Sequence, residues 1–108
     1  MVRYRNNILE MNGKLFQYEE EIKAIFNYNS LFVIFLAGRT FPKNNIFAIS
    51  KDGVKIWSIE EIIRLGKEET YVNAQQINEE ELEVISSSGI LSRINVFTHE
   101  VIKKSILK

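Results

Sequence analysis

The sequence predicts a mainly β (α+β) fold, an antiparallel meander of about seven or eight strands with one or two short helices. Three observations predict it. Turn signals recur at close intervals, among them Asn12-Gly13 and Asp52-Gly53, which are typical of tight hairpins. The segments between the turns are short and rich in β-branched and aromatic residues. No linker divides the 108 residues, so we expect a single domain over residues 1–108.

The first predicted hairpin is built around Asn12-Gly13. A two-residue type I′ turn needs positive φ at both central positions, and Asn-Gly tolerates this. We expect the turn to join a strand near residues 8–11 to one near residues 14–18. Residues 18–28 combine apolar residues at helical spacing with tyrosine and phenylalanine, which suit a strand. Both a short helix and a strand therefore remain open for that segment.

The central strand is predicted over residues 31–37. This run is apolar throughout, which is typical of a strand that is covered on both faces. Residues 38–45 hold the only proline, a glycine and two asparagines, so they predict a loop, long enough to be functional. A second hairpin follows, with strands over residues 46–50 and 54–58.

A short helix is predicted directly after this hairpin. Ser58 and Glu61 match a capping box, and Gly66 is placed to end the helix. Three isoleucines fall on one face: Ile59, Ile62 and Ile63. We expect about two helical turns.

The last third of the chain predicts three more strands, over residues 81–86, 90–97 and 101–107. Turns are expected at residues 87–89 and 98–100. The sheet edges are placed toward the chain termini, because the lysines there would discourage edge-to-edge pairing. These are Lys103, Lys104 and Lys108.

The composition argues against several classes of partner. The formal net charge is zero, so no global field favours nucleic acid or an anionic membrane. The absence of cysteine suits a reducing compartment. No apolar signal-peptide region follows residues 1–7, and the longest apolar run is far short of the roughly 20 residues that span a bilayer. We expect a cytoplasmic protein without a nucleic-acid or membrane partner.

Residues suited to catalysis or metal binding are few. The only histidine, His99, and the single aspartate, Asp52, both lie in predicted turns, and without cysteine they cannot build a conventional zinc site. We interpret His99 as a turn residue, since histidine tolerates left-handed backbone. Ser86-Ser87-Ser88-Gly89 lacks the frame of a hydrolase nucleophile, and no phosphate-binding glycine motif occurs. We therefore expect no enzyme, no cofactor and no metal. Trp57 is expected in the core, with a ligand pocket as the alternative.

The glutamates are concentrated in one part of the chain. Between Ile56 and Ile85 there are eight, against Arg64 and Lys67, which gives a segmental charge of minus six in a protein that is neutral overall. Such asymmetry can attract a basic partner, or it can serve solubility alone. The candidate partner-binding residues are Glu60, Glu61, Glu68, Glu69, Glu79, Glu80, Glu81 and Glu83.

Two segments of the chain resemble units of a PQQ-type propeller. Residues 45–57 resemble the strand, Asp-Gly turn, strand and tryptophan of such a repeat, and residues 82–102 resemble a second unit, with His99 where those repeats usually have glycine. A closed propeller needs about four or more blades of about 40 residues, so this chain cannot be one. The cofactor site of those enzymes is not carried over.

The whole chain more closely resembles small stand-alone bacterial proteins that pair Asn-Ile-x-Ala-Ile-x-x-x-Gly-x-x-x-Trp, here residues 45–57, with a later glycine hairpin. Several of these resemble immunity partners of polymorphic or contact-dependent toxins. The resemblance implies a protein-binding module that neutralises a cognate toxin by occluding its active site, with a basic toxin domain as the partner. The open alternative is a small-ligand-binding or subunit module without catalytic activity, as a monomer or homo-oligomer, which uses the loop 38–45 and Trp57.

Overall fold

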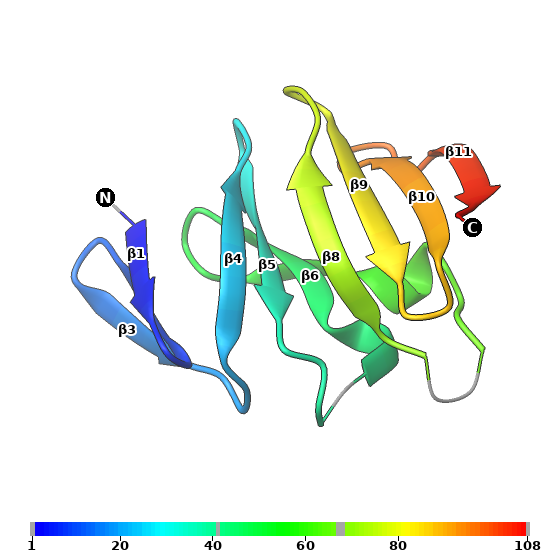
Figure 1. The fold of residues 1–108 in the computed structure, drawn as a ribbon. Helices are drawn as coiled ribbons and strands as arrows, with labels where there is room; N and C mark the ends of the chain where they lie inside the picture. Colours follow the sequence, from blue (N-terminus) through cyan, green and yellow to red (C-terminus); the bar gives the residue numbers. More distant parts are fainter. Residues whose placement is uncertain (1, 41, 67–68, 108) are drawn as a thin grey trace.

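The chain forms three antiparallel β-sheets that follow one another along the sequence. The computed structural model describes residues 2–40, 42–66 and 69–107. In these ranges there are eleven strands, and each sheet is a meander in which every strand pairs with its neighbours in sequence. Figure 1 shows the sheets as successive layers, with the second between the other two. The predicted mainly β, antiparallel fold is confirmed at this level.

The first sheet has the order β1-β2-β3, with β1 (Val2–Arg5), β2 (Ile8–Met11) and β3 (Lys14–Gln17). Asn12 and Gly13, which join β2 to β3, have φ values of 51° and 81°. Positive φ at both positions is what a type I′ turn requires, so this predicted hairpin is confirmed.

The middle sheet has the order β4-β5-β6-β7, and the last sheet has the order β8-β9-β10-β11. The middle sheet contains β4 (Ile22–Asn27), β5 (Leu31–Leu36), β6 (Ile46–Ser50) and β7 (Lys55–Ser58). The last sheet contains β8 (Tyr71–Gln76), β9 (Glu81–Ser86), β10 (Ile90–Asn95) and β11 (Val101–Ile106).

The predicted number of strands was too low, because two of the strands are largely exposed. Only the first residue of β1 is partly buried, and β8 buries Tyr71 and part of Ala74 while its asparagine and glutamines face outward. A strand with so few apolar residues has no clear alternation to recognise. The segment 18–28, for which helix and strand were both open, forms β4.

The predicted two-turn helix is wrong. In its place the structure has a single turn of 3₁₀ helix, η2 (Ile59–Glu61), and a second such turn, η1 (Pro42–Asn44), lies within the predicted loop 38–45. The Glu61 carboxylate accepts a hydrogen bond from the Ser58 N–H at 2.8 Å, as in a capping box. Three isoleucines in five residues disfavour a longer helix. No helix among the described residues is long and apolar enough to cross a membrane.

The middle sheet is covered on both faces, as predicted for the run 31–37. All six residues of β5 are buried. One apolar cluster lies between the first and middle sheets and includes Leu9, Ile34 and Ile49, and a larger one lies between the middle and last sheets and includes Val33 and Val84. Alternate β5 side chains therefore enter different cores, which explains why this strand shows no polar face.

Polar contacts connect the middle and last sheets inside the larger core. Asn45 is fully buried, and its Nδ2 donates hydrogen bonds to the carbonyls of Leu36 and Tyr71, both at 2.9 Å. Trp57 is 1% exposed, and its indole Nε1 donates to the carbonyl of Val96 at 2.9 Å. The expected core position of Trp57 is therefore confirmed.

The predicted placement of sheet edges near the termini is confirmed for β1 and β11, which each pair on one side only. Lys103 and Lys104 lie on β11 and are exposed. Lys108 lies outside the described residues.

Candidate functional site

The structure divides the predicted acidic segment into separate groups. Glu68 lies outside the described residues, as does Lys67. The others are distributed as follows: Glu60 and Glu61 in η2, Glu69 before β8, Glu79 and Glu80 in the β8–β9 turn, and Glu81 and Glu83 on β9. Figure 1 shows the β8–β9 turn and the start of β8 at opposite ends of the last sheet. These residues therefore do not form one continuous surface.

Two of the carboxylates are engaged in local loop contacts. Glu61 accepts from the Ser58 backbone, as described above. Glu69 accepts hydrogen bonds from the Ser88 hydroxyl and, at 2.9 Å, from the Gly66 N–H. The hydrogen bond from Ser88, followed by that from Gly66, holds the pKa of Glu69 below its usual range. Its carboxylate connects the segment before β8 to the β9–β10 turn. The serine-rich turn is thus a polar hairpin turn, as interpreted from the sequence.

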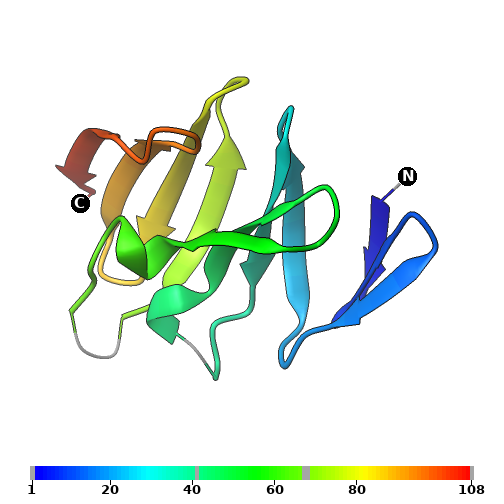
Figure 2. The same ribbon diagram turned by 180° about the vertical axis from the view of Figure 1, so that it is seen from behind.

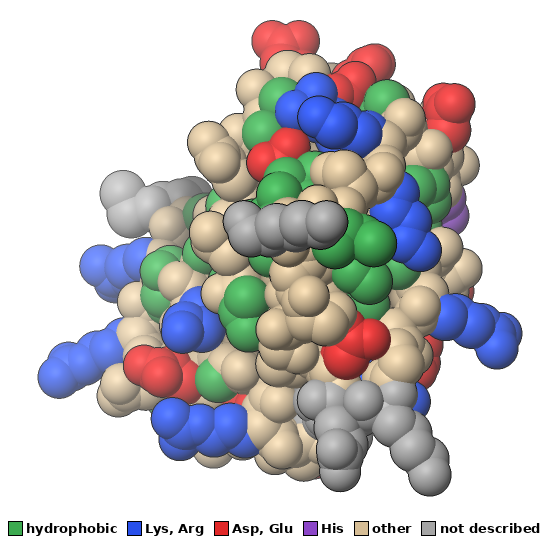
Figure 3. Space-filling model, turned by 45° about the vertical axis from the view of Figure 1, so that its right-hand side comes forward, with side chains coloured by type: hydrophobic (Ala, Val, Ile, Leu, Met, Phe, Trp, Pro, Cys, Tyr) green, Lys and Arg blue, Asp and Glu red, His purple; other side chains and the backbone are tan. Residues whose placement is uncertain are grey.

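Glu60 stays with Glu61 in η2, and the remaining four described glutamates, Glu79, Glu80, Glu81 and Glu83, lie at one end of the last sheet. Arg93 on β10 lies between two of them, with its guanidinium 3.0 Å from the Glu83 carboxylate and 3.9 Å from that of Glu81. Glu79 and Glu80 in the turn form no ion pair among the described residues. In Figure 3 acidic side chains gather at the top, the end where the β8–β9 turn lies. This end of the sheet therefore carries two carboxylates that form no ion pair within the described part of the chain.

The outer face of the last sheet has no covering layer. Ile85 and Leu91 lie opposite each other across β9 and β10, and both are partly buried. The neighbouring cross-strand pair is Glu83 and Arg93, and the Arg93 Nε is buried without a hydrogen-bond partner among the described residues. The outer face of the last sheet thus presents an apolar pair beside a charged pair. Both faces of the middle sheet, by contrast, are covered by the other sheets.

The edge strand β11 is the most apolar exposed element of this side. It and the residue after it carry four large apolar side chains that are 42% to 72% exposed. They are Val101, Ile102, Ile106 and Leu107. Figure 3, which turns this side forward, shows hydrophobic side chains in the middle of the view with lysine, arginine and acidic side chains around them. We call β11 with Leu107, the β8–β9 turn and the outer face of the last sheet the open side.

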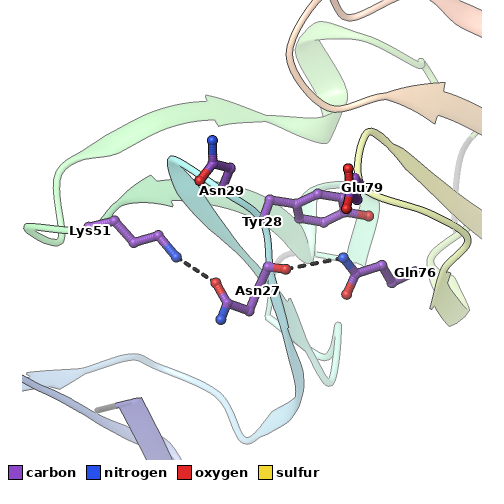
Figure 4. A pocket seen from close by; sticks show the side chains of 6 residues that line it. All are labelled: Asn27, Tyr28, Asn29, Lys51, Gln76 and Glu79. Carbon is purple, nitrogen blue, oxygen red and sulfur yellow. Dashed lines mark hydrogen bonds between the residues drawn. The ribbon is translucent and has the colours of Figure 1, made fainter.

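A polar hollow of about 620 Å³ lies where three hairpin ends meet. Figure 4 shows how its side chains lie: Asn27, Tyr28, Asn29, Lys51, Gln76 and Glu79. The Lys51 ammonium donates to Asn27 Oδ1 at 2.5 Å, and the Gln76 amide donates to the Asn27 carbonyl at 3.1 Å. Burial lowers the pKa of Lys51. Three of the six lining residues, Asn27, Lys51 and Gln76, thus bind each other and hold the hairpin ends together.

The remaining candidates from the sequence have structural roles. His99 has a φ of 68°, which confirms the predicted left-handed turn residue, and its ring packs 5.9 Å from that of Trp57. In the predicted loop, Asn45 is buried and bonded as described, and Phe41 lies outside the described residues. Among the residues that the structure describes, no group of three or more His, Cys, Asp or Glu side chains could hold a metal ion.

Sequence reasoning missed the apolar character of the edge at β11. The signal was visible as four apolar residues around a pair of lysines in residues 101–107. The sequence predicts that the lysines protect this edge, but in β11 they alternate with apolar side chains on both faces of the strand.

No curated protein matches this chain significantly. One family model, described as a domain of unknown function and named DUF7957, matches residues 1–106. This match covers nearly the whole chain, including all three sheets. The chain therefore belongs to the DUF7957 family.

Proposed function

We propose that this chain is a protein-binding module that binds its partner through the open side. The observation that carries the proposal is the apolar edge at β11, where four large apolar side chains are exposed on and just after one strand. Water-exposed apolar residues on an unpaired edge favour association with another protein. The backbone groups of the same edge can add hydrogen bonds to such a contact.

Charge supports a basic partner. Glu79 and Glu80 lie in the β8–β9 turn at the end of this side, where Glu79 also lines the polar hollow. Glu81 and Glu83 form their ion pairs with Arg93, and Lys103 lies opposite Arg93 on β11. A negative end of this kind accelerates the approach of a positively charged protein and orients it. Together with the resemblance to immunity proteins, this supports a specific form of the proposal, in which the chain neutralises a basic toxin domain by covering its active site.

The alternative of a small-ligand module is not supported by the same surfaces. It depended on a pocket beside Trp57, and that side chain is 1% exposed in a filled core. In the polar hollow near Asn27, three of the lining residues, Asn27, Lys51 and Gln76, already bind each other. We therefore prefer the protein-binding function.

The proposal is tested with the proteins encoded by the genes on either side of this one, each purified and mixed with this chain. We expect one of them to form a stoichiometric complex, detected by size-exclusion chromatography with light scattering. If it is a toxin, co-expression of this chain should restore growth. A neighbourhood whose products neither bind nor are toxic would overturn the proposal.

A matched pair of substitutions then locates the contact. Ile106→Lys places a charge on the open side, whereas Val54→Lys places one at the β6–β7 turn, and both residues are highly exposed at 72% and 65%. We expect Ile106→Lys to weaken the complex about tenfold or more, because it replaces the most exposed of the four apolar side chains with a charge that the contact would have to bury. Val54→Lys should leave the affinity unchanged. Equal losses would place the interface elsewhere.

A further inference from the structure

A groove of about 610 Å³ runs along β3, between the first and middle sheets and away from the open side. Apolar side chains form most of its lining: Leu15, Phe16 and Tyr18 on one side, and Leu36, Phe47 and Ile49 on the other. Glu19 and Lys55 stand among them. The groove is therefore an apolar channel with one charge of each sign.

The groove occupies the place of a strand that the first sheet lacks. The middle and last sheets have four strands, and the first has three. Tyr4 on β1 donates its hydroxyl to the carbonyl of Lys23 on β4 at 3.3 Å, and the Tyr18 ring after β3 lies 5.4 Å from the Phe47 ring on β6. The first sheet is thus stacked strand over strand on the middle one, and its absent fourth strand would lie over β7.

The backbone of β3 is in phase to accept such a strand. The Tyr18 N–H donates to the Asn7 carbonyl at 2.9 Å, so Asn7 and Tyr18 are a hydrogen-bonded pair of the β2–β3 ladder. In an antiparallel ladder such pairs alternate, so Phe16 and Lys14 also bond to β2. The N–H and C=O groups of Leu15 and Gln17 then point to the open edge. β3 pairs with β2 alone among the described strands, and Leu15 is 70% exposed.

The shape of the groove favours one extended segment over a second copy of this chain. The β6–β7 hairpin reaches toward the first sheet in Figure 2, and Gly53 at its turn is so close to the Phe16 ring that an added Cβ would lie 2.5 Å from it. If a second copy paired its own β3 antiparallel with this β3, the middle sheets of both copies would lie on the same side of the joined first sheets. The middle sheet of the second copy would then collide with β7 of the first. A single strand avoids this clash.

The charges along the edge give the segment a direction. Lys14 begins β3 and Glu19 follows its end, and neither forms an ion pair within the described ranges. An antiparallel guest runs the other way, so its first residue meets Glu19 and its last meets Lys14. A basic residue at its start and an acidic one at its end would complement both charges.

We propose that the first sheet accepts an extended segment of another protein as its fourth strand, antiparallel to β3. The segment has a basic residue at its amino end, alternating apolar side chains that enter the groove beside Phe16 and Phe47, and an acidic residue at its carboxyl end. This inference goes beyond the function proposed above, because it uses a different surface of the chain and a partner in extended form.

The test uses the peptide acetyl-Lys-Val-Thr-Val-Thr-Glu-amide with the isotope-labelled full chain, followed by amide NMR. When the peptide lysine lies opposite Glu19, both valine side chains enter the groove. The backbone groups of the two threonines then form hydrogen bonds with Leu15 and Gln17. We expect saturable shifts of the Leu15, Gln17 and Phe47 resonances. No shift at millimolar peptide, or shifts confined to β11, would overturn the proposal.

Two methylated peptides separate strand addition from simple apolar binding. N-methylation of both threonines removes the donors that would face β3, whereas N-methylation of both valines removes donors that would face away. We expect the first change to weaken binding about tenfold or more, because each net hydrogen bond contributes about 1 kcal/mol, and the second to weaken it far less. Equal effects would show that no ladder forms.

A protein variant connects the result to the function proposed above. Ile106→Lys should leave peptide binding unchanged, because it lies on β11. Leu15→Pro removes one of the two outward donors on β3, the other being that of Gln17, and places a proline ring at the edge. It should weaken peptide binding clearly, yet leave a complex made through the open side intact. Loss of both interactions in a folded Leu15→Pro protein would contradict the separation of the two surfaces.

Discussion

Two buried tyrosines differ in whether their hydroxyl groups are satisfied. The Tyr28 hydroxyl donates to the Glu81 carbonyl at 2.8 Å, whereas the Tyr71 hydroxyl is buried without a partner among the described residues. We predict that Tyr71→Phe raises the free energy of unfolding by about 1 kcal/mol, because it removes an unsatisfied polar group. Tyr28→Phe should lower it by about 1 kcal/mol. Urea unfolding followed by circular dichroism measures both, and a loss with Tyr71→Phe would contradict the assignment.

The same tyrosines predict the response to alkaline pH. Burial, and then the nearby Glu81 for Tyr28 and the nearby Glu69 and Glu60 for Tyr71, raise both pKa values above the usual value of about 10. The unfolded chain therefore releases these protons at a lower pH than the folded one. The contribution of these tyrosines to the free energy of unfolding is fully present below about pH 10. Above that pH it falls by about 1.4 kcal/mol per pH unit for each tyrosine. Unfolding free energies between pH 8 and 11 test this, and the double phenylalanine variant should show a shallower decline.

The sequence predicts residue roles well where local chemistry determines them. The left-handed backbone at Asn12, Gly13 and His99 depends on residue type and turn position, and it is present in the structure. Asn45 is different, because its full burial depends on carbonyl groups of β5 and β8 that come together only in the stacked sheets. Arg93 likewise meets Glu83 through strand register, which spacing alone does not reveal.

The turn of the β6–β7 hairpin contacts the first sheet at Phe16, and substitutions of two glycines test whether this contact stabilises the fold. Gly53 and Gly13 both have positive φ, but an added Cβ at Gly53 would meet the Phe16 ring at 2.5 Å, whereas at Gly13 nothing lies within 4 Å. We predict that Gly13→Ala lowers the free energy of unfolding by about 1 kcal/mol, because alanine disfavours the left-handed backbone conformation. Gly53→Ala should cost clearly more, because Phe16 must also move.

Thermal unfolding of both glycine variants provides the measurement. The Phe16 resonances should shift in Gly53→Ala and stay in place in Gly13→Ala. Similar losses of stability in the two proteins would mean that Phe16 is not held by this turn.

At the scale of elements, strength of pattern decided what could be predicted. The apolar run of β5 predicted that strand, and the glycine-containing turns after β6 and after β9 predicted the strands beside them. The strand β8 faces solvent along one side and has few apolar residues, so it was missed. The predicted helix is only the single turn η2, because three β-branched isoleucines within residues 59–63 disfavour a longer helix.

The order of the layers predicts different protection of the three sheets against hydrogen exchange. The middle sheet is covered on both faces, whereas β1 is an edge strand of a three-stranded sheet with three of its four residues exposed. We expect amides of β5 and β6 to exchange most slowly and those of β1 and β3 much faster. Mass-spectrometric exchange of the intact chain tests this. Equal protection of β1 and β5 would show that the layers open as one unit.

The candidate site depended on the whole molecule. The glutamates were visible in the sequence, but their division between the ends of the last sheet follows from the direction of β8 and β9. The groove along β3 exists only because a three-stranded sheet is stacked on a four-stranded one. Neither feature has a local signature.

The meander order of the three sheets also bears on synthesis of the chain. Every strand pairs with the strand just before or after it, and no pairing spans from one sheet to another. Each sheet can therefore close its hydrogen bonds as soon as its own strands leave the ribosome, without waiting for later residues. When the middle sheet forms, the first sheet can already cover one of its faces. Its other face stays exposed to solvent until residues 71–106 emerge and form the last sheet.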